Sequence, residues 1–258
     1  MIKYNEEEAR KTDRAYSTPD VVRQRMRTLE VLKLQTGETV LDVGCGSGLL
    51  TQDIATLVGE QGRVVGIDNS QDMLVLAEQR CSEFSQVQLK LCDIESLSEK
   101  TGEFDAVTCI QVLLYVSDVS AALSEMYRVL KPGGRITIME TDWRGTVLNS
   151  SDESLTRKML TSWDDAVSSP NLPARLVPLM KSKGFSAVSV DAFPIVNTSY
   201  TQGSWSIGML KQFAGHAQKQ GAVSAAESES WLDDIQSKGK DGCYFFSVNR
   251  FIFTAVKV

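Results

Sequence analysis

The chain has 258 residues, of which 42% are hydrophobic and 23% are charged. This mixture is typical of one globular α/β domain with a modest addition or a small cap. The formal net charge is −6, and no run of Lys or Arg exceeds two residues. We therefore expect no nucleic-acid partner, because neutralising phosphates requires a basic surface.

The sequence also argues against membrane insertion and a metal centre. Its apolar runs are too short to cross a bilayer, and its charged beginning lacks the apolar segment of a secretory signal. These features predict a cytoplasmic location. The five cysteines are scattered, and His216 is the single histidine. We therefore expect reduced thiols and no metal site.

The N-terminal segment divides into a polar stretch and a helix. Residues 1–18 are polar and lack hydrophobic periodicity, which favours a mobile arm. Thr18 and Pro19 then form a helix start, with a hydroxyl N-cap before a proline at the first helical position. The helix is expected to run to about Leu34 and to be broken at Gly37.

Beyond this helix, apolar strand-like segments alternate with helical ones. The expected strands cover residues 39–44, 63–68, 87–93, 104–111 and 135–141, and the expected helices cover residues 48–58, 71–83 and 118–130. Strands separated by helices indicate a parallel sheet that is covered on both faces. In the remaining sequence we expect a loop and an inserted helix at 143–170, a helix at 172–183 and a strand at 187–195. Residues 203–240 are expected to be helical with interruptions at Gly215 and Gly221, and residues 243–258 are expected to form a terminal strand.

A glycine-rich segment follows the first strand and has the features of a ligand site. Gly44, Gly46 and Gly48 lead from that strand directly into a helix. Glycines allow a ligand to lie against the backbone, beside the positive N-terminus of the helix. A tight turn without a ligand is the alternative interpretation.

The glycine pattern alone does not distinguish a dinucleotide from S-adenosylmethionine. A dinucleotide fingerprint would have a third glycine at the position of Leu49. Asp42, two residues before the first glycine, would repel a pyrophosphate. Asp68 ends the second strand, about 20 residues after the loop, where it can accept hydrogen bonds from ribose hydroxyls. Asp68 therefore favours an adenosine but fits both kinds of ligand.

Five successive segments resemble the motifs of class I (Rossmann-like) S-adenosylmethionine-dependent methyltransferases. They are VLDVGCGSG, VVGIDNSQDML, LCDIESL, FDAVTCIQVLLYV and RVLKPGGRITI, which occur in order between residues 36 and 140. More narrowly, the chain is similar to the bacterial small-molecule branch with ubiquinone/menaquinone-type and natural-product enzymes. The resemblance implies a doubly wound α/β fold with a seven-stranded, mostly parallel sheet. It also implies helices on both faces, a small helical cap, and an antiparallel last strand, residues 243–258, at the sheet edge.

The resemblance also implies which residues bind the methionine and ribose parts of S-adenosylmethionine. Gly44 and Gly46 would pass under the methionine part, Asp42 would lie near its amino group, and Gln111 would line its pocket. Asp68 would hold the ribose. Asn69 would lie beside the ribose, or could instead cap the following helix.

By the same resemblance, Met73, Asp93 and Ile94 would surround the adenine. Met73 would pack on the ring, although a core position explains this residue equally well. Asp93 would accept a hydrogen bond from the exocyclic amino group, and a solvated turn aspartate is its alternative. Tyr4 and Tyr16 would close over the cofactor, as arms do in related enzymes.

The resemblance divides the chain into two parts. Residues 1–35 would form an N-terminal arm and helix that cover the cofactor site. Residues 36–258 would form the methyltransferase domain, with cap insertions at about 143–170 and 203–240. The helix at 203–219 could act as a lid or as the contact of a homodimer, or could simply pack in the core.

Methyl transfer from a sulfonium is an in-line displacement that depends mainly on alignment and on the exclusion of water. A base is needed only when the acceptor must lose a proton before it attacks. Tyr115 and Asp142, near the ends of the fourth and fifth strands, are the candidate catalytic residues. A buried aromatic and a turn residue, respectively, are the alternatives. His216 lies in a polar stretch and is expected to be a solvated helix residue.

These features predict a methyltransferase that forms S-adenosyl-L-homocysteine and acts on oxygen, nitrogen or carbon of a small molecule. The expected insertions would roof the pocket and favour a compact acceptor. A methyltransferase for protein or RNA, an NAD(P)-dependent oxidoreductase and a non-catalytic S-adenosylmethionine-binding module remain alternatives.

Overall fold

The computed structural model describes residues 5–258, which form one seven-stranded sheet with the order β3-β2-β1-β4-β5-β7-β6. Strands β1 to β5 run parallel, and β7 is antiparallel to both of its neighbours. The strands are β1 Thr39–Val43, β2 Arg63–Asp68, β3 Val87–Leu91, β4 Phe104–Ile110, β5 Leu130–Leu148, β6 Phe185–Asn197 and β7 Phe246–Lys257. The predicted fold class is therefore confirmed.

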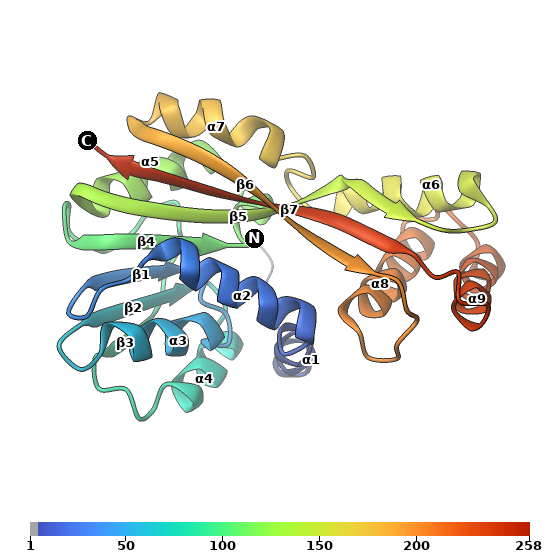
Figure 1. The fold of residues 1–258 in the computed structure, drawn as a ribbon, viewed down its shortest axis with the longest axis horizontal. Helices are drawn as coiled ribbons and strands as arrows, with labels where there is room; N and C mark the ends of the chain where they lie inside the picture. Colours follow the sequence, from blue (N-terminus) through green and yellow to red (C-terminus); the bar gives the residue numbers. More distant parts are fainter. Residues whose placement is uncertain (1–4) are drawn as a thin grey trace.

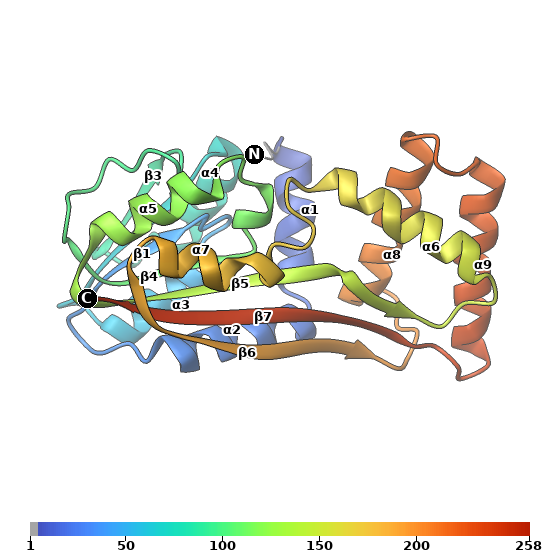
Figure 2. The same ribbon diagram turned by 90° about the horizontal axis from the view of Figure 1, so that it is seen from above.

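Helices cover both faces of the parallel part of this sheet (Figures 1 and 2). Helices α2 and α3 pack on one face, whereas α5 and α7 pack on the other. The α-helices are α1 Glu6–Tyr16, α2 Pro19–Leu32, α3 Leu49–Val58, α4 Gln71–Arg80, α5 Val119–Val129, α6 Glu153–Ser162, α7 Pro173–Ser182, α8 Trp205–Lys219 and α9 Ala225–Lys240. Two short 3-10 helices are η1 Leu113–Tyr115 and η2 Trp163–Ala166.

The long strands β5, β6 and β7 extend beyond the parallel part of the sheet and carry a second lobe (Figure 2). Helices α6, α8 and α9 form this lobe, which we call the cap. Its core is rich in aromatic side chains, with Trp143, Trp205, Phe213, Trp231 and Phe246 all buried. Helix α1 lies between the cap and the parallel part of the sheet in both views.

The structure corrects the expected N-terminal arm. Residues 6–16 form helix α1, which begins with a capping box: the Asn5 side chain accepts from the Glu8 backbone, and the Glu8 side chain accepts from the Asn5 backbone. The sequence of this helix has almost no apolar stripe, because Ala9 is the only residue of α1 that is buried. Hydrophobic periodicity therefore does not reveal it. The expected helix from Pro19 is confirmed as α2, but the expected hydroxyl cap is wrong. The Thr18 side chain makes no capping hydrogen bond, and its hydroxyl group donates to the Ala15 carbonyl at 2.7 Å instead.

Three expectations about the C-terminal half were also wrong. Strand β5 does not end at residue 141 but continues to Leu148, with a bulge between Asp142 and Val147. The last strand, β7, lies between β5 and β6 rather than at the sheet edge. Helix α8 continues through Gly215, so the break falls only at Gly221, after the helix.

Candidate functional site

The three glycines of the loop between β1 and α3 have left-handed backbone conformations, with φ of 71° at Gly44, 53° at Gly46 and 80° at Gly48. A Cβ atom at Gly44 would overlap the side chain of Val112, and one at Gly48 would lie 2.9 Å from Ala77 Cβ. A Cβ atom at Gly46 would meet nothing within 4 Å. Two glycines therefore serve packing, whereas Gly46 presents bare backbone to open space, as a ligand that rests on the loop requires.

Asp68, the last residue of β2, fixes the shape of this loop. Its carboxylate accepts a hydrogen bond from the backbone N–H of Gly46 at 2.9 Å and another from Ser70 at 2.9 Å. Burial raises the pKa of Asp68, and these hydrogen bonds partly offset that effect. Ser70 is the N-cap of α4, so the alternative that Asn69 caps this helix is wrong.

Asp42 lies beneath the loop and is 2% exposed. Its Oδ2 accepts a hydrogen bond from the Thr51 hydroxyl at 2.6 Å. Burial raises the pKa of Asp42 to about 7, and the negative charge of Asp68 contributes in the same direction. A cation close to this carboxyl group would stabilise its charged form, which is what the expected contact with an amino group requires.

The candidate adenine contacts occupy different environments. Met73 on α4 and Ile94 after β3 are each 2% exposed. Asp93 is exposed, and its Oδ1 accepts a hydrogen bond from the Glu95 backbone at 3.0 Å. Asp93 thus makes a local turn hydrogen bond and keeps carboxylate lone pairs directed to the surface, so both interpretations of this residue fit its geometry.

Gln111 connects the end of β4 to β5. It has a φ of 61°, and its backbone N–H and its side-chain Nε2 both donate to the Met139 carbonyl, at 2.8 and 3.1 Å. Its Oε1 accepts a hydrogen bond from the Thr141 hydroxyl. The carboxamide is therefore held by β5, in a backbone conformation that is uncommon for a residue other than glycine.

Glu140 is a buried acidic residue that the sequence interpretation missed. Its side chain is fully buried, and Oε1 accepts from the backbone N–H groups of Val112 and Leu113 at 3.1 and 2.7 Å. Burial raises the pKa of Glu140 to about 8. The carboxyl group holds the start of η1 and thereby positions Tyr115. An acidic residue inside an otherwise buried strand is the sequence signal that could have identified it.

The two candidate catalytic residues lie on different elements, Tyr115 in η1 and Asp142 in β5. Tyr115 ends η1, and burial raises the pKa of its hydroxyl group, so at neutral pH this group is protonated and can donate a hydrogen bond. Asp142 is half-buried within β5, opposite Asn249 of β7, rather than at the end of a strand. A Cβ atom at Gly145 would lie 2.7 Å from its Oδ2.

Helix α1 is attached to the glycine loop by a small polar network that sequence reasoning did not identify. Asp13 Oδ1 accepts a hydrogen bond from the Ser47 hydroxyl at 2.6 Å and pairs with Arg80 Nη2 at 2.9 Å. Arg80 also donates to the Ser47 carbonyl. Tyr16, at the end of α1, packs against the core of the cap. Tyr4 lies outside the described residues.

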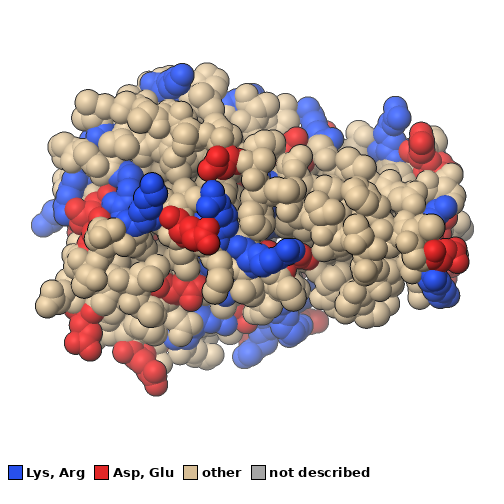
Figure 3. Space-filling view, viewed as in Figure 1, with Lys and Arg blue, Asp and Glu red and all other residues tan. Residues whose placement is uncertain are grey.

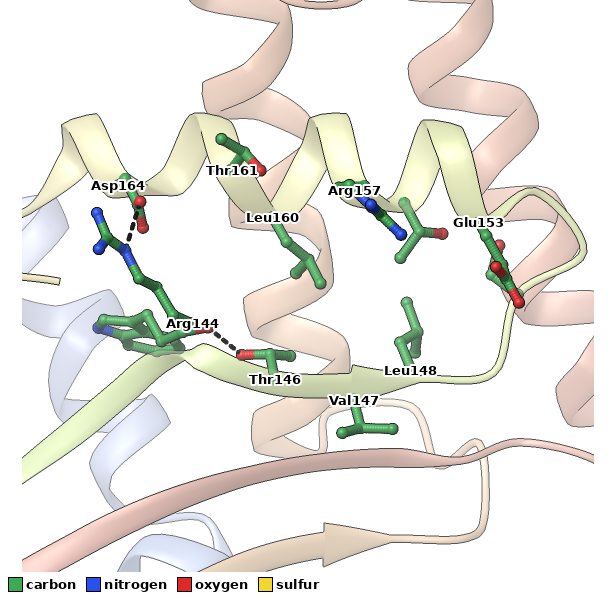
Figure 4. A pocket seen from close by; sticks show the side chains of 12 residues that line it. Arg144, Thr146, Val147, Leu148, Glu153, Arg157, Leu160, Thr161 and Asp164 are labelled. Carbon is green, nitrogen blue, oxygen red and sulfur yellow. Dashed lines mark hydrogen bonds and ion pairs between the residues drawn. The ribbon is translucent and has the colours of Figure 1, made fainter. Parts of the chain in front are cut away.

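A hollow of about 630 Å³ lies in the cap, between the extension of β5 and helix α6 (Figure 4). Arg144 lies on its strand side and forms an ion pair with Asp164 at 2.8 Å. None of the residues expected to bind a cofactor lines this hollow. It is thus a feature of the cap rather than of the glycine loop.

His216, expected to be solvated, is half-buried instead. Its ring packs edge-on against Trp163 at 5.5 Å, and its Nε2 has no hydrogen-bond partner among the residues described. Within residues 5–258, no group of three or more His, Cys, Asp or Glu side chains could hold a metal ion. Nor does that part of the chain contain a helix with the length and apolarity needed to span a bilayer.

The sequence model of a family described as "Methyltransferase domain" matches residues 34–189. An uncharacterized 37.1 kDa protein in transposon TN4556 of Streptomyces fradiae is 31% identical over 228 residues, which are 88% of this chain and 65% of that protein. The demethylmenaquinone methyltransferase of Oceanobacillus iheyensis is 39% identical over 119 residues, or 45% of this chain and 50% of the relative. The chain thus spans about half to two thirds of the length of these curated relatives.

Solved structures share the fold at low sequence identity. Phosphoethanolamine N-methyltransferase 2 of Haemonchus contortus, in complex with phosphomonomethylethanolamine and S-adenosylhomocysteine, has a TM-score of 0.65 and 19% identity. This alignment covers 98% of the present chain and 58% of that chain. Geranyl diphosphate C-methyltransferase of Streptomyces coelicolor has a TM-score of 0.60 and 17% identity, with coverage of 92% and 76%. These likenesses show a shared fold.

Proposed function

The chain belongs to the family of methyltransferase domains, and on this premise we propose that it transfers a methyl group from S-adenosylmethionine to a small-molecule acceptor. The observation that carries the proposal is the open side of Gly46, whose N–H donates to the Asp68 carboxylate. The buried carboxyl group of Asp42 is close enough to interact with the charge of Asp68. Bare backbone fits the methionine part of the cofactor. Asp42 can neutralise its ammonium group, and Asp68 retains lone pairs that can accept from ribose hydroxyls.

When bound, S-adenosylmethionine supplies a methyl group that is already activated by the positive charge on sulfur. The protein has to position the acceptor and exclude water. In this proposal Tyr115 donates a hydrogen bond to the acceptor, because its hydroxyl group stays protonated. Glu140 positions Tyr115 through its hydrogen bonds to the backbone of η1. Asp142 accepts a proton when the acceptor must lose one.

The remaining contacts of the cofactor are proposed at the positions that the resemblance gives. Asn69 would lie beside the ribose, Met73 and Ile94 would contact the adenine, and Gln111 would border the methionine part. Asp93 would accept from the adenine amino group with a lone pair that its bond to Glu95 leaves available. Each of these assignments predicts a loss of cofactor affinity when the side chain is changed.

Two features favour a small acceptor over a macromolecule. The relatives named above include enzymes whose names refer to demethylmenaquinone and geranyl diphosphate, both small molecules. On the face of the molecule in Figure 3, basic and acidic side chains are mixed, and the cap presents few charges. This face does not provide the basic footprint that an RNA substrate requires.

The proposal keeps the cytoplasm as the location of the reaction, in line with the expected reduced thiols. A homodimer would need a surface other than the apolar face of α8. That face is buried within the cap through Trp205, Met209, Leu210 and Phe213.

The test uses methyl-labelled S-adenosylmethionine, the purified protein and a metabolite extract together with a macromolecule extract of its source cells. We expect protein-dependent label in the small-molecule fraction, which mass spectrometry can then identify. Label confined to protein or RNA would contradict the proposed substrate class. Absence of label from both fractions would contradict methyl transfer to a cellular acceptor.

A further inference from the structure

We propose that Arg250 binds an oxyanion, a carboxylate or phosphate group carried by the methyl acceptor. The inference rests on the proposed function, since it names a chemical property of the acceptor. Arg250 lies on β7, the strand between β5 and β6, opposite Thr141 on one side and Phe193 on the other.

A chain of contacts connects this position to the glycine loop. Paired residues of adjacent strands project to the same face of a sheet, so Arg250 and Thr141 share a face. The Thr141 hydroxyl donates to Gln111, and the next residue, Val112, occupies the space beside Gly44. Arg250 therefore lies toward the proposed cofactor site, at the junction between the parallel sheet and the cap.

The charge of Arg250 is buried, and no carboxylate of the described residues lies within ion-pairing distance of it. The residue is 4% exposed, and its Nε has no hydrogen-bond partner among residues 5–258. Within the same range, none of the ion pairs found at 4.0 Å or less includes Arg250. Two acidic residues interact electrostatically with Arg250, namely Asp20 and Glu140. Asp20 is already paired with Arg23 at 2.6 Å. Burial raises the pKa of Glu140 to about 8, so this group is mostly neutral at pH 7. Buried charges in proteins are normally paired.

The surroundings of Arg250 resemble a recognition site in which one partner is missing. Its guanidinium lies over the Trp205 ring, 4.6 Å from the ring centroid, and this contact fixes the plane of the group. The phenol groups of Tyr16 and Tyr115 are close enough to interact with its charge. Although burial lowers the pKa of Arg250 to about 10, the group remains charged at neutral pH.

The orphaned Nε indicates the geometry of binding. The Nε–H and an adjacent Nη–H of a guanidinium point in parallel along one edge, and this pair matches the two oxygens of a carboxylate or phosphate. Stacking on Trp205 alone would use the face of the guanidinium and would leave this edge without function. An oxyanion at the edge would neutralise the charge and satisfy Nε together.

The experiment measures thermal unfolding of the full chain loaded with S-adenosylhomocysteine, in the presence of benzoate, phenyl phosphate or neutral benzamide at constant ionic strength. We expect benzoate or phenyl phosphate to raise the Tm of the wild-type protein, and benzamide to have no such effect. A response to benzoate alone identifies a carboxylate site, and a response to phenyl phosphate alone identifies a phosphate site. Because the proposed contact is bidentate and charge-assisted, we expect Arg250→Gln to lower the affinity for the anion at least about tenfold.

The matched control is Arg144→Gln, which removes an arginine of the cap whose side chain is 54% exposed. This variant is expected to keep the wild-type response. Arg250→Lys, which retains the charge but not the fork, is expected to bind the anion more weakly than the wild type. Because the comparison of benzoate with benzamide needs only the wild-type protein, it remains decisive if Arg250→Gln does not fold.

Equal responses to benzoate, phenyl phosphate and benzamide in the wild-type protein, including no response to any of them, would overturn the inference. Unchanged anion affinity in a folded Arg250→Gln variant would do the same. This readout requires no turnover, so it is separate from the labelled-methyl assay. If a small molecule is labelled but no anion raises the Tm, the role of Arg250 is wrong and the proposed function stands. If an anion raises the Tm but no product is labelled, the result counts against the proposed function.

Discussion

At the scale of single residues, the acidic groups beneath the glycine loop matter most, because burial shifts their protonation toward neutral pH. Asp42 has no cationic partner within ion-pairing distance in the described chain, and burial raises its pKa to about 7. A buried carboxyl group of this kind is ready to bind a cation but must lose its proton to do so.

This protonation gives the cofactor affinity a definite pH dependence. If the cofactor ammonium pairs with ionised Asp42, binding releases the proton that Asp42 holds below pH 7. Affinity for S-adenosylhomocysteine should therefore rise about tenfold between pH 6 and pH 8, as follows from a pKa near 7 in the free protein and well below 6 in the complex. Calorimetry across this range, in buffers of different ionisation enthalpy, measures both the affinity and the released proton.

The control for this prediction is Asp42→Asn, which cannot lose a proton and is expected to bind weakly with a flatter pH profile. The variant retains any titration of the ligand's own amino group, so the difference between the two profiles belongs to Asp42. Identical slopes in the two proteins would exclude Asp42 as the partner of the ammonium group.

Residue-scale interpretation of the sequence had an identifiable limit. The glycines and Asp68 could be located because a strand, a loop and a helix follow one another within a short segment. Arg250 could not be located, because it is a charged residue in a strand and its burial depends on what the cap places over it. The local alternation of apolar and polar residues does not reveal which strands are covered on both faces of the sheet.

At the scale of secondary-structure elements, α1 is attached to the glycine loop and to α4 through Asp13. The side chains of Asp13 and Arg80 are 23% and 20% exposed, so their ion pair is only partly screened and should contribute at most about 1 kcal/mol to global stability. Its main effect is local, because it determines how often α1 leaves the glycine loop.

We therefore expect Asp13→Asn to accelerate hydrogen exchange in α1 and to speed the release of S-adenosylhomocysteine severalfold, with little change in Tm. The reason is that α1 would open more often over the loop. Exchange mass spectrometry and stopped-flow dissociation measure the two effects.

Glu6→Gln is the matched control, because it removes an exposed ion pair of the same helix, with Arg10 at 3.1 Å. It should leave ligand release unchanged. If Asp13→Asn and Glu6→Gln alter release equally, the contact with the glycine loop has no role in retaining the ligand.

Two elements escaped prediction for different physical reasons. Helix α1 has almost no apolar stripe, and its readable signal was the capping box of Asn5 and Glu8. The extension of β5 is stabilised by pairing at a distance, with Val147 opposite Ser247 of β7. Such pairing depends on residues about one hundred positions away and has no signature in the local sequence.

At the scale of the whole molecule, the sheet performs two tasks. Its parallel part brings the ends of β1, β2 and β4 together at one edge, where ligands of open α/β sheets bind. Its long strands β5, β7 and β6 continue past that edge and support the cap (Figure 2). The alternation of strands and helices predicted the first task. The support of the cap depends on the position of β7 between β5 and β6. The alternation of strands and helices along the chain does not predict this strand order.

The use of S-adenosylmethionine as the cofactor is tested most directly by a calorimetric titration of the protein with S-adenosylmethionine and, separately, with NAD and NADP. We expect micromolar binding of S-adenosylmethionine and no signal with the dinucleotides. Gly46→Ala should weaken that binding strongly, because the added methyl group occupies the open space that the ligand needs. Gly221→Ala, with the same kind of strain at a φ of 71° but in the cap, should bind like the wild type. Binding of NAD or NADP in place of S-adenosylmethionine would show that the chain is not an S-adenosylmethionine-dependent methyltransferase.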